Sequence, residues 1–323
     1  MYATLTHTDI ETAVRAATLA PSVLNVQPWR FVAHGDVIEL HRDPDRALPV
    51  TDPGNRALTI SCGAALFNLR LAIAHLAGHP EIDVLPDPAR PTLLAVVRPG
   101  DGTEPTAIES RLYVAIRDRR SSRVPFVDQP LPVETVVRIE NAAATEGGTL
   151  RFLNAYEAAD VGKLVRQADL VQRADADIRA EVGRWIGRGQ DAVDGIPHIS
   201  LGPRPTDPST LVRDFAMGLP VEGRDRAAFE HNPTLAVLLS DHDGPTDWLS
   251  TGQALERLWL EATMAGAGVS LLTQPLEMPG MRWLARPAAA GRFWPQALLR
   301  LGIPTRSTPP TPRRPVTDVL TFG

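Results

Sequence analysis

A short proline-bracketed segment, residues 20–31, carries the first side chains in this chain that could bind a ligand. Its sequence is APSVLNVQPWRF, and three small polar residues lie between Pro21 and Pro28: Ser22, Asn25 and Gln27. Each proline ends a helix and favours extended geometry in the residue before it. A loop fixed at both ends can direct backbone N–H groups and amides toward a planar or anionic ligand. The alternative is an ordinary helix–loop–strand connection around a buried Trp29.

The hydrophobic pattern predicts the elements that must hold this loop. In the first third of the chain we expect helices over residues 9–19 and 56–77 and strands over 31–40, with a turn at 34–36, and over 92–97. Residues 98–105 form a polar linker rich in Pro and Gly. We therefore predict a first lobe, residues 1–105, and a second lobe, residues 106–323.

The second lobe is predicted to alternate helices and strands around one irregular stretch. Helices are expected over 108–118, 133–144, 158–185 and 250–265, and strands over 149–154, 235–240 and 298–302. Gly and Pro interrupt any periodicity in residues 187–225. A stretch of that length is usually a functional cover or disordered. The apolar run FAMGL at residues 215–219 indicates packing, so we expect a lid inserted into the second lobe.

An internal repeat relates the two lobes. Residues 63–71, GAALFNLRL, align without gaps on residues 252–260, GQALERLWL. Shorter matches upstream follow the same order, since VRAA at residues 14–17 and RF at 30–31 have counterparts within 137–143 and at 151–152. We infer two copies of one α+β unit fused head to tail.

The segment of residues 20–31 resembles the signature Ala-Pro-Ser-x-x-Asn-x-Gln-Pro-Trp-x-Phe of the nitroreductase superfamily of FMN flavoproteins. In that family FMN lies at a homodimer interface, where one subunit supplies an Arg-x-Ser-x-Lys/Arg element and the other supplies the Pro-Ser-x-x-Asn loop. Here the second lobe has the arginine element at residues 119–123 but lacks the Pro-Ser-x-x-Asn loop. The first lobe has that loop but lacks an arginine element. This pattern resembles the Acg-like branch. It implies an α+β fold of two nitroreductase-like lobes, each an antiparallel-rich sheet flanked by helices, fused as an intrachain pseudo-dimer with one complete site.

The resemblance also implies FMN as the cofactor and a set of residues that hold it. Arg119, Ser121 and Arg123 alternate, so an extended segment places them on one face, and guanidinium groups suit phosphate oxygens. A solvated arginine run at a helix C-terminus is the alternative. The implied cofactor-binding residues are Pro21, Ser22, Asn25, Gln27, Arg119, Ser121, Arg123, Leu271, Leu272, Thr273, Gln274 and Arg313. The family often has a carboxylate near flavin N5, where this chain has Thr273.

The activity implied by the resemblance is an oxidoreductase that passes hydride from NAD(P)H through FMN to a small nitroaromatic or quinone-like acceptor. The flavin carries that chemistry, so we expect no catalytic acid, base or nucleophile. An alternative is a flavin-storing or sensing protein whose lid is closed and whose turnover is small. A third is an inactive scaffold without flavin. We expect one FMN per chain and a monomer.

Composition excludes several other classes of function. The net charge of −5 and a pI near 5.9 argue against a nucleic-acid binder that works by bulk charge. The single cysteine, Cys62, excludes an intramolecular disulfide and a cysteine-cluster metal site, and its apolar surroundings are more typical of a core thiol than of a nucleophile. Eight scattered histidines have no ligand spacing, so we expect no metal. Without an N-terminal signal or an apolar run of 18 residues, we expect a cytoplasmic protein that does not enter a membrane.

Overall fold

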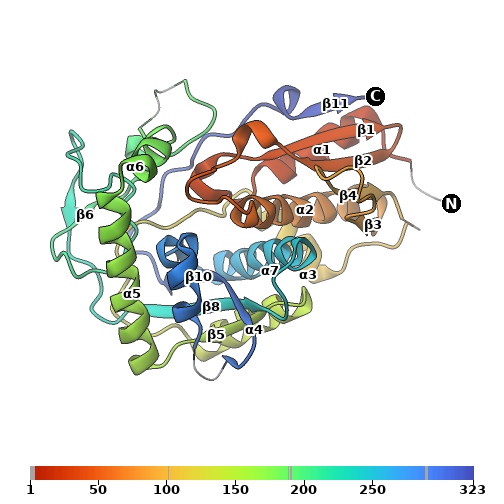
Figure 1. Cartoon of the computed structure of the whole chain (residues 1–323). Coiled ribbons are helices and arrows are strands. Elements are labelled where there is room, and N and C mark those ends of the chain that lie inside the picture. The colour runs from red at the N-terminus through yellow and green to blue at the C-terminus, as the bar shows by residue number, and fades with distance from the viewer. Residues whose placement is uncertain (1–3, 101, 188, 190, 288–289) are drawn as a thin grey trace.

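Two long helices cross at the centre of the molecule, with one sheet on either side of them (Figure 1). The computed structural model describes residues 4–100, 102–187, 189, 191–287 and 290–323. The central helices are α2 (Arg56–Ala77) and α7 (Pro245–Met264). Within the described residues, α2 alone is long and apolar enough to cross a membrane, but 89% of its apolar window is buried inside the fold. It is therefore the core helix that the periodicity predicted.

The first sheet belongs to residues 1–105, with one strand added from the C-terminus. Its strands are β1 (Trp29–His34), β2 (Val37–Arg42), β3 (Glu81–Val84), β4 (Leu93–Arg98) and β11 (Leu320–Phe322). They lie in the order β11-β1-β2-β4-β3, and β11 is parallel to β1 while the other pairs are antiparallel. Helix α1 (His7–Thr18) packs on α2 and is capped by Thr6, whose side chain accepts from Asp9 N. The short strands β3 and β11 were not predicted from the sequence.

The second sheet repeats this order. Its strands are β5 (Thr149–Phe152), β8 (Thr234–Ser240), β9 (Gly268–Leu271) and β10 (Trp294–Gly302), in the order β5-β8-β10-β9, with every pair antiparallel. Taken in chain order, β5, β8, β9 and β10 hold the places that β1, β2, β3 and β4 hold in the first sheet. Helix α4 (Val133–Thr145) packs on α7 as α1 packs on α2. Mixed α+β architecture is thus confirmed, with eight α-helices among the described residues.

The crossing of α2 and α7 joins equivalent positions of the sequence repeat. Gly63 lies against Leu249 O and Gly252 Cα, and Gly252 lies against Ile60 O and Gly63 Cα. The repeat aligns Gly63 with Gly252 and places Leu249 opposite Ile60, so each helix makes the same contact with the other. A side chain at either glycine would push into the backbone of the opposing helix.

Helices α5 and α6 and the short strand β6 lie along one side of the molecule, whereas α3 packs on the central helices (Figure 1). The predicted helix over 158–185 is in fact two helices, α5 (Ala155–Ala174) and α6 (Ala176–Gly183). The break falls at Asp175, whose backbone is extended and whose carboxylate caps α6 by accepting from Asp177 N and Ile178 N. Helix α3 (Ala107–Ala115) leads into the arginine element. Residues 187–225, described except for 188 and 190, contain one short 3-10 turn (His198–Ser200) and the two-residue strand β6 (Arg204–Pro205), which pairs with β7 (Arg226–Ala227).

Candidate functional site

Two adjoining cavities lie where the proline-bracketed loop and the arginine element come together. The large cavity has walls from the loop of residues 21–24, from α2 and α7, from β9 and the turn after it, and from the insertion. The small cavity is lined by the same loop, by residues 119–123 and by the C-terminal segment 309–313. Four residues line both cavities: Pro21, Ser22, Ser121 and Arg123. The proline-bracketed loop and the arginine element of residues 119–123 therefore meet.

Nine of the twelve predicted site residues line these cavities. Besides the four shared residues, Leu271 and Thr273 line the large cavity, and Asn25, Arg119 and Arg313 line the small one. They come from four separate parts of the chain, brought together by the packing of α2 on α7 and by the pairing of β11 near the C-terminus with β1.

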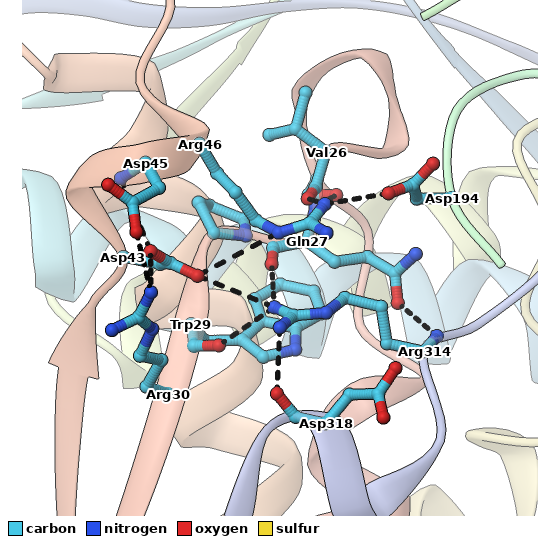
Figure 2. A network of polar contacts seen from close by, with 12 residues as sticks. Val26, Gln27, Trp29, Arg30, Asp43, Asp45, Arg46, Asp194, Arg314 and Asp318 are labelled. Atoms are coloured by element: carbon cyan, nitrogen blue, oxygen red, sulfur yellow. Dashed lines mark hydrogen bonds and ion pairs between the residues drawn. The ribbon is translucent and has the colours of Figure 1, made fainter.

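The other three predicted residues, Gln27, Leu272 and Gln274, lie behind the cavity walls. The Gln27 side chain donates to Val193 O at 2.9 Å and accepts from Arg314 N at 2.8 Å, so both ends of its amide bind protein. It belongs to a network of polar contacts around Asp43 and Arg314 that ties the loop to the C-terminal segment and the insertion (Figure 2). Leu272 is fully buried in a hydrophobic cluster. Gln274 is buried at the start of the 3-10 turn Gln274–Glu277.

The proline-bracketed loop is held in an unusual backbone conformation. Leu24, Asn25 and Gln27 have positive φ, which non-glycine residues seldom adopt. Hydrogen bonds fix it: Gln27 N donates to Ser22 Oγ at 3.0 Å, and Val23 N donates to Ser61 Oγ of α2 at 3.2 Å. The loop therefore presents a preformed wall to both cavities.

Positive charge is concentrated and buried around the small cavity. Arg119 and Arg123 are buried, and Arg313 is half-buried with its Nε shielded from solvent. Burial, reinforced by Arg119, lowers the pKa of Arg313 to about 9, and burial with repulsion from Arg213 lowers the pKa of Arg123 to about 10. Among the described residues, Arg119 Nη1 and Arg313 Nε have no hydrogen-bond partner. These cations repel one another and lower one another's pKa, and two of them keep N–H groups without partners. Such a group of arginines is suited to bind an anion.

The residues of the large cavity that were not identified from the sequence include Arg56, Arg213, Phe215 and Glu277. Arg213 and Phe215 come from the insertion, where no periodicity marks them. The ring of Phe215 lies between two guanidinium groups, with its centroid 5.0 Å from that of Arg123 and 4.7 Å from that of Arg213. Arg56, at the start of α2, donates to Gln296 O at 2.8 Å.

Glu277 supplies a buried carboxylate beside Thr273. Thr273 Oγ1 donates to Glu277 Oε1 at 2.7 Å, Arg213 forms an ion pair with the same carboxylate, and Gln172 Nε2 donates to Oε2 at 2.8 Å. Burial opposes its charge, but Arg213 and these hydrogen bonds hold the pKa of Glu277 below its usual value. The sequence signal was available, because Glu277 follows Thr273 by one turn.

No group of three or more His, Cys, Asp or Glu side chains that could hold a metal ion occurs in the described part of the chain. Cys62 is fully buried, donates to Pro28 O, and has a pKa raised by burial. Cys62 is therefore a core thiol, and it lines neither cavity.

Comparison with known proteins places the chain among nitroreductase relatives. No family model matches it. It is 33% identical over 327 residues to the Mycobacterium tuberculosis protein named "Putative NAD(P)H nitroreductase acg", covering 98% of this chain and 97% of the relative. A second M. tuberculosis protein named as a "Putative NAD(P)H nitroreductase" is 31% identical, covering 96% and 90%. A solved nitroreductase with bound FMN from Desulfitobacterium hafniense is 15% identical, with a TM-score of 0.40, and covers 66% of this chain and 98% of that one.

Proposed function

Because the chain belongs to the nitroreductase superfamily, in the branch of the mycobacterial Acg proteins, we propose that it is an FMN-dependent oxidoreductase that uses NAD(P)H. Its acceptors would be small nitroaromatic or quinone-like molecules. FMN, when bound, supplies the hydride chemistry, and the protein positions and tunes it. The observation that carries the proposal is the meeting of the proline-bracketed loop with Arg119, Arg123 and Arg313 around two adjoining cavities.

The residues present fit FMN. The unpartnered guanidinium nitrogens of Arg119 and Arg313 suit a phosphate, as do Ser121 and Arg123 between the two cavities. The large cavity has the mainly apolar walls that suit a flavin ring, including Ile60, Leu271 and Trp259. This chain would therefore hold the phosphate in the small cavity and the ring in the large one.

We further propose that residues 1–105 and 106–323 are two fused nitroreductase-like lobes forming an intrachain pseudo-dimer. The matched order of the two sheets and the reciprocal contact of Gly63 with Gly252 support this, because symmetric partners meet through equivalent positions. In such an arrangement one chain replaces two subunits, and we expect a monomer.

The counterparts of two residues of the large cavity are bound to each other, and one of them also to Glu146, which supports one FMN per chain. The repeat aligns the cavity residues Ala64 and Trp259 with Gln253 and Arg70. Arg70 Nη1 donates to Gln253 Oε1 at 2.6 Å and to Glu146 Oε2 at 2.7 Å. Arg257 Nη1 donates to Glu146 Oε1 at 2.9 Å. A bridged ion pair thus occupies the counterpart position, next to the shortened loop of the second lobe.

A second candidate function, flavin storage or sensing, is favoured by the insertion. We propose that residues 187–225 act as a lid, since Arg213 and Phe215 line the large cavity and Asn25 Nδ2 donates to Gly195 O at 2.8 Å. A closed lid would keep nicotinamide from the flavin and favour retention over turnover.

Rapid mixing with NADPH separates the two functions. Bleaching of the flavin within seconds supports the oxidoreductase, whereas no bleaching over minutes supports storage. If purified protein carries no flavin and takes up none, both are wrong.

The assignment of the phosphate site has its own test. Arg119→Ala combined with Arg123→Ala should abolish FMN retention, because two buried guanidiniums that suit the phosphate are lost. Cofactor released by denaturant and quantified per chain measures this. The exposed pair Arg98 and Asp83 offers a control, since Arg98→Ala removes an arginine far from both cavities. Unchanged FMN content in the double variant would refute the assignment.

A further inference from the structure

One carboxylate lies directly behind the arginines of the small cavity. Glu256, on α7, has no exposed surface, and its Oε1 lies 3.4 Å from Arg119 Nε. Arg313 from the C-terminal segment and Asn68 from α2 also face it. Neither the sequence pattern nor the proposed FMN contacts use this residue, yet it is in contact with the guanidinium that lines the cavity.

Arg119 is shared between this carboxylate and the cavity. Its Nε forms an ion pair with Glu256 and its Nη2 donates to Leu19 O at 3.0 Å, but neither Nε nor Nη1 has a hydrogen-bond partner among the described residues. Its guanidinium plane also lies over the Trp259 ring, 5.0 Å from the centroid. Glu256 and Leu19 therefore fix the orientation in which Arg119 meets an anion.

We propose that Glu256 is a positioning residue of the phosphate site, which holds Arg119 through Nε and takes up a proton when a phosphate monoester enters the small cavity. The inference rests on the proposed function, because it takes FMN as the source of that phosphate. Its physical basis is repulsion: a phosphate with up to two negative charges and a buried carboxylate compete for the same guanidinium. Protonation of Glu256 removes the competition.

The direction of the pH effect follows from the protonation state of Glu256 before the phosphate binds. Burial, opposed by Arg119, raises the pKa of Glu256 to about 7. A bound phosphate raises this pKa further, so binding above pH 7 requires proton uptake and affinity falls as pH rises. Below pH 7 the carboxyl is already protonated, and the linkage disappears. The other charged groups that face Glu256 stay mostly cationic in this range, because even the lowered pKa of Arg313 is about 9, and Arg120 lies beyond Arg119.

The test measures FMN affinity of the flavin-free full chain from pH 5.5 to 8.5, with riboflavin as the ligand that lacks phosphate. Wild-type affinity for FMN should rise up to about pH 6, as the phosphate loses its second proton, and then fall about tenfold between pH 7 and 8.5. Glu256→Gln should keep the rise and lose the fall. Riboflavin should show neither change.

A matched control lies on the same helix. Glu261 is also partly buried with a raised pKa, but it faces Arg138 across a separate surface groove. Glu261→Gln should therefore keep the wild-type fall above pH 7. A loss of pH dependence in both variants would mean a general effect on α7 and would overturn the proposal.

Calorimetry on the wild type keeps the inference testable if Glu256→Gln does not fold. Titration with FMN at pH 7.5 in two buffers of different ionisation enthalpy should report uptake of about half a proton or more per FMN. Uptake near zero, or the same uptake with riboflavin, overturns the inference. Absence of FMN binding at every pH overturns the proposed function as well, whereas pH-independent FMN binding overturns only the role of Glu256.

Discussion

Replacing Gly63 by alanine should destabilise the whole molecule through the crossing of α2 and α7. A Cβ at Gly63 would lie 3.0 Å from Gly252 Cα and still closer to Leu249 O. Both obstacles are backbone atoms, which cannot move aside as a flexible side chain does. The helices would have to separate by about 1 Å, and a gap of that size forfeits a quarter to a half of each lost dispersion contact.

The magnitude follows from two opposing effects. Overpacking a tight contact costs about 1–3 kcal/mol, and a backbone obstacle puts this site at the upper end. Alanine is favoured over glycine in a helix by about 1 kcal/mol. We therefore expect Gly63→Ala to lower the free energy of unfolding by about 2 kcal/mol. Ile60 and Ala64, on the same face of α2, line the large cavity, so FMN affinity should fall as well.

Urea denaturation followed by circular dichroism measures the change, and two further variants sharpen it. Gly183→Ala, at the end of α6 where a Cβ meets nothing within 4 Å, should be neutral or stabilising. Gly63→Ala with Gly252→Ala should cost less than the two single changes together, because one separation of the helices serves both. A stable Gly63→Ala variant with unchanged midpoint would refute the close crossing as the centre of the fold.

Two further variants test the insertion. Phe215 lines both the large cavity and an outer cavity beside the insertion. Phe215→Ala should therefore join the two cavities and raise iodide quenching of flavin fluorescence severalfold. Leu219→Ala changes only the outer cavity and should leave the quenching unchanged. The buried carboxylate of Glu181 accepts hydrogen bonds from Thr51 N at 2.8 Å and Thr51 Oγ1 at 2.7 Å. Glu181→Gln should therefore cost about 1–3 kcal/mol and speed proteolysis within the insertion, unlike the exposed Glu222→Gln. Equal cleavage rates in these two variants would contradict an anchoring role for Glu181.

Local patterns in the sequence determined a large part of this protein. Helical periodicity located the core helix α2. The turn at residues 34–36 was predicted between the strands that are β1 and β2 in the structure. The repeat that aligns residues 63–71 with 252–260 anticipated the two equivalent helices at the centre. These features depend on side-chain spacing and turn chemistry within a few residues, which the sequence carries directly.

The tertiary structure alone decided which side chains face the cavities. Gln27 sits within the same motif as Ser22, yet the positive φ of its backbone and its bonds to Val193 and Arg314 place it behind the wall. Arg213 reaches the cavity from a segment without periodicity. Glu256 meets Arg119 although the two residues are 137 positions apart and no local pattern marks the pair. Such contacts depend on the path of the chain between distant residues, because burial and charge act through space and leave no regular spacing in the sequence.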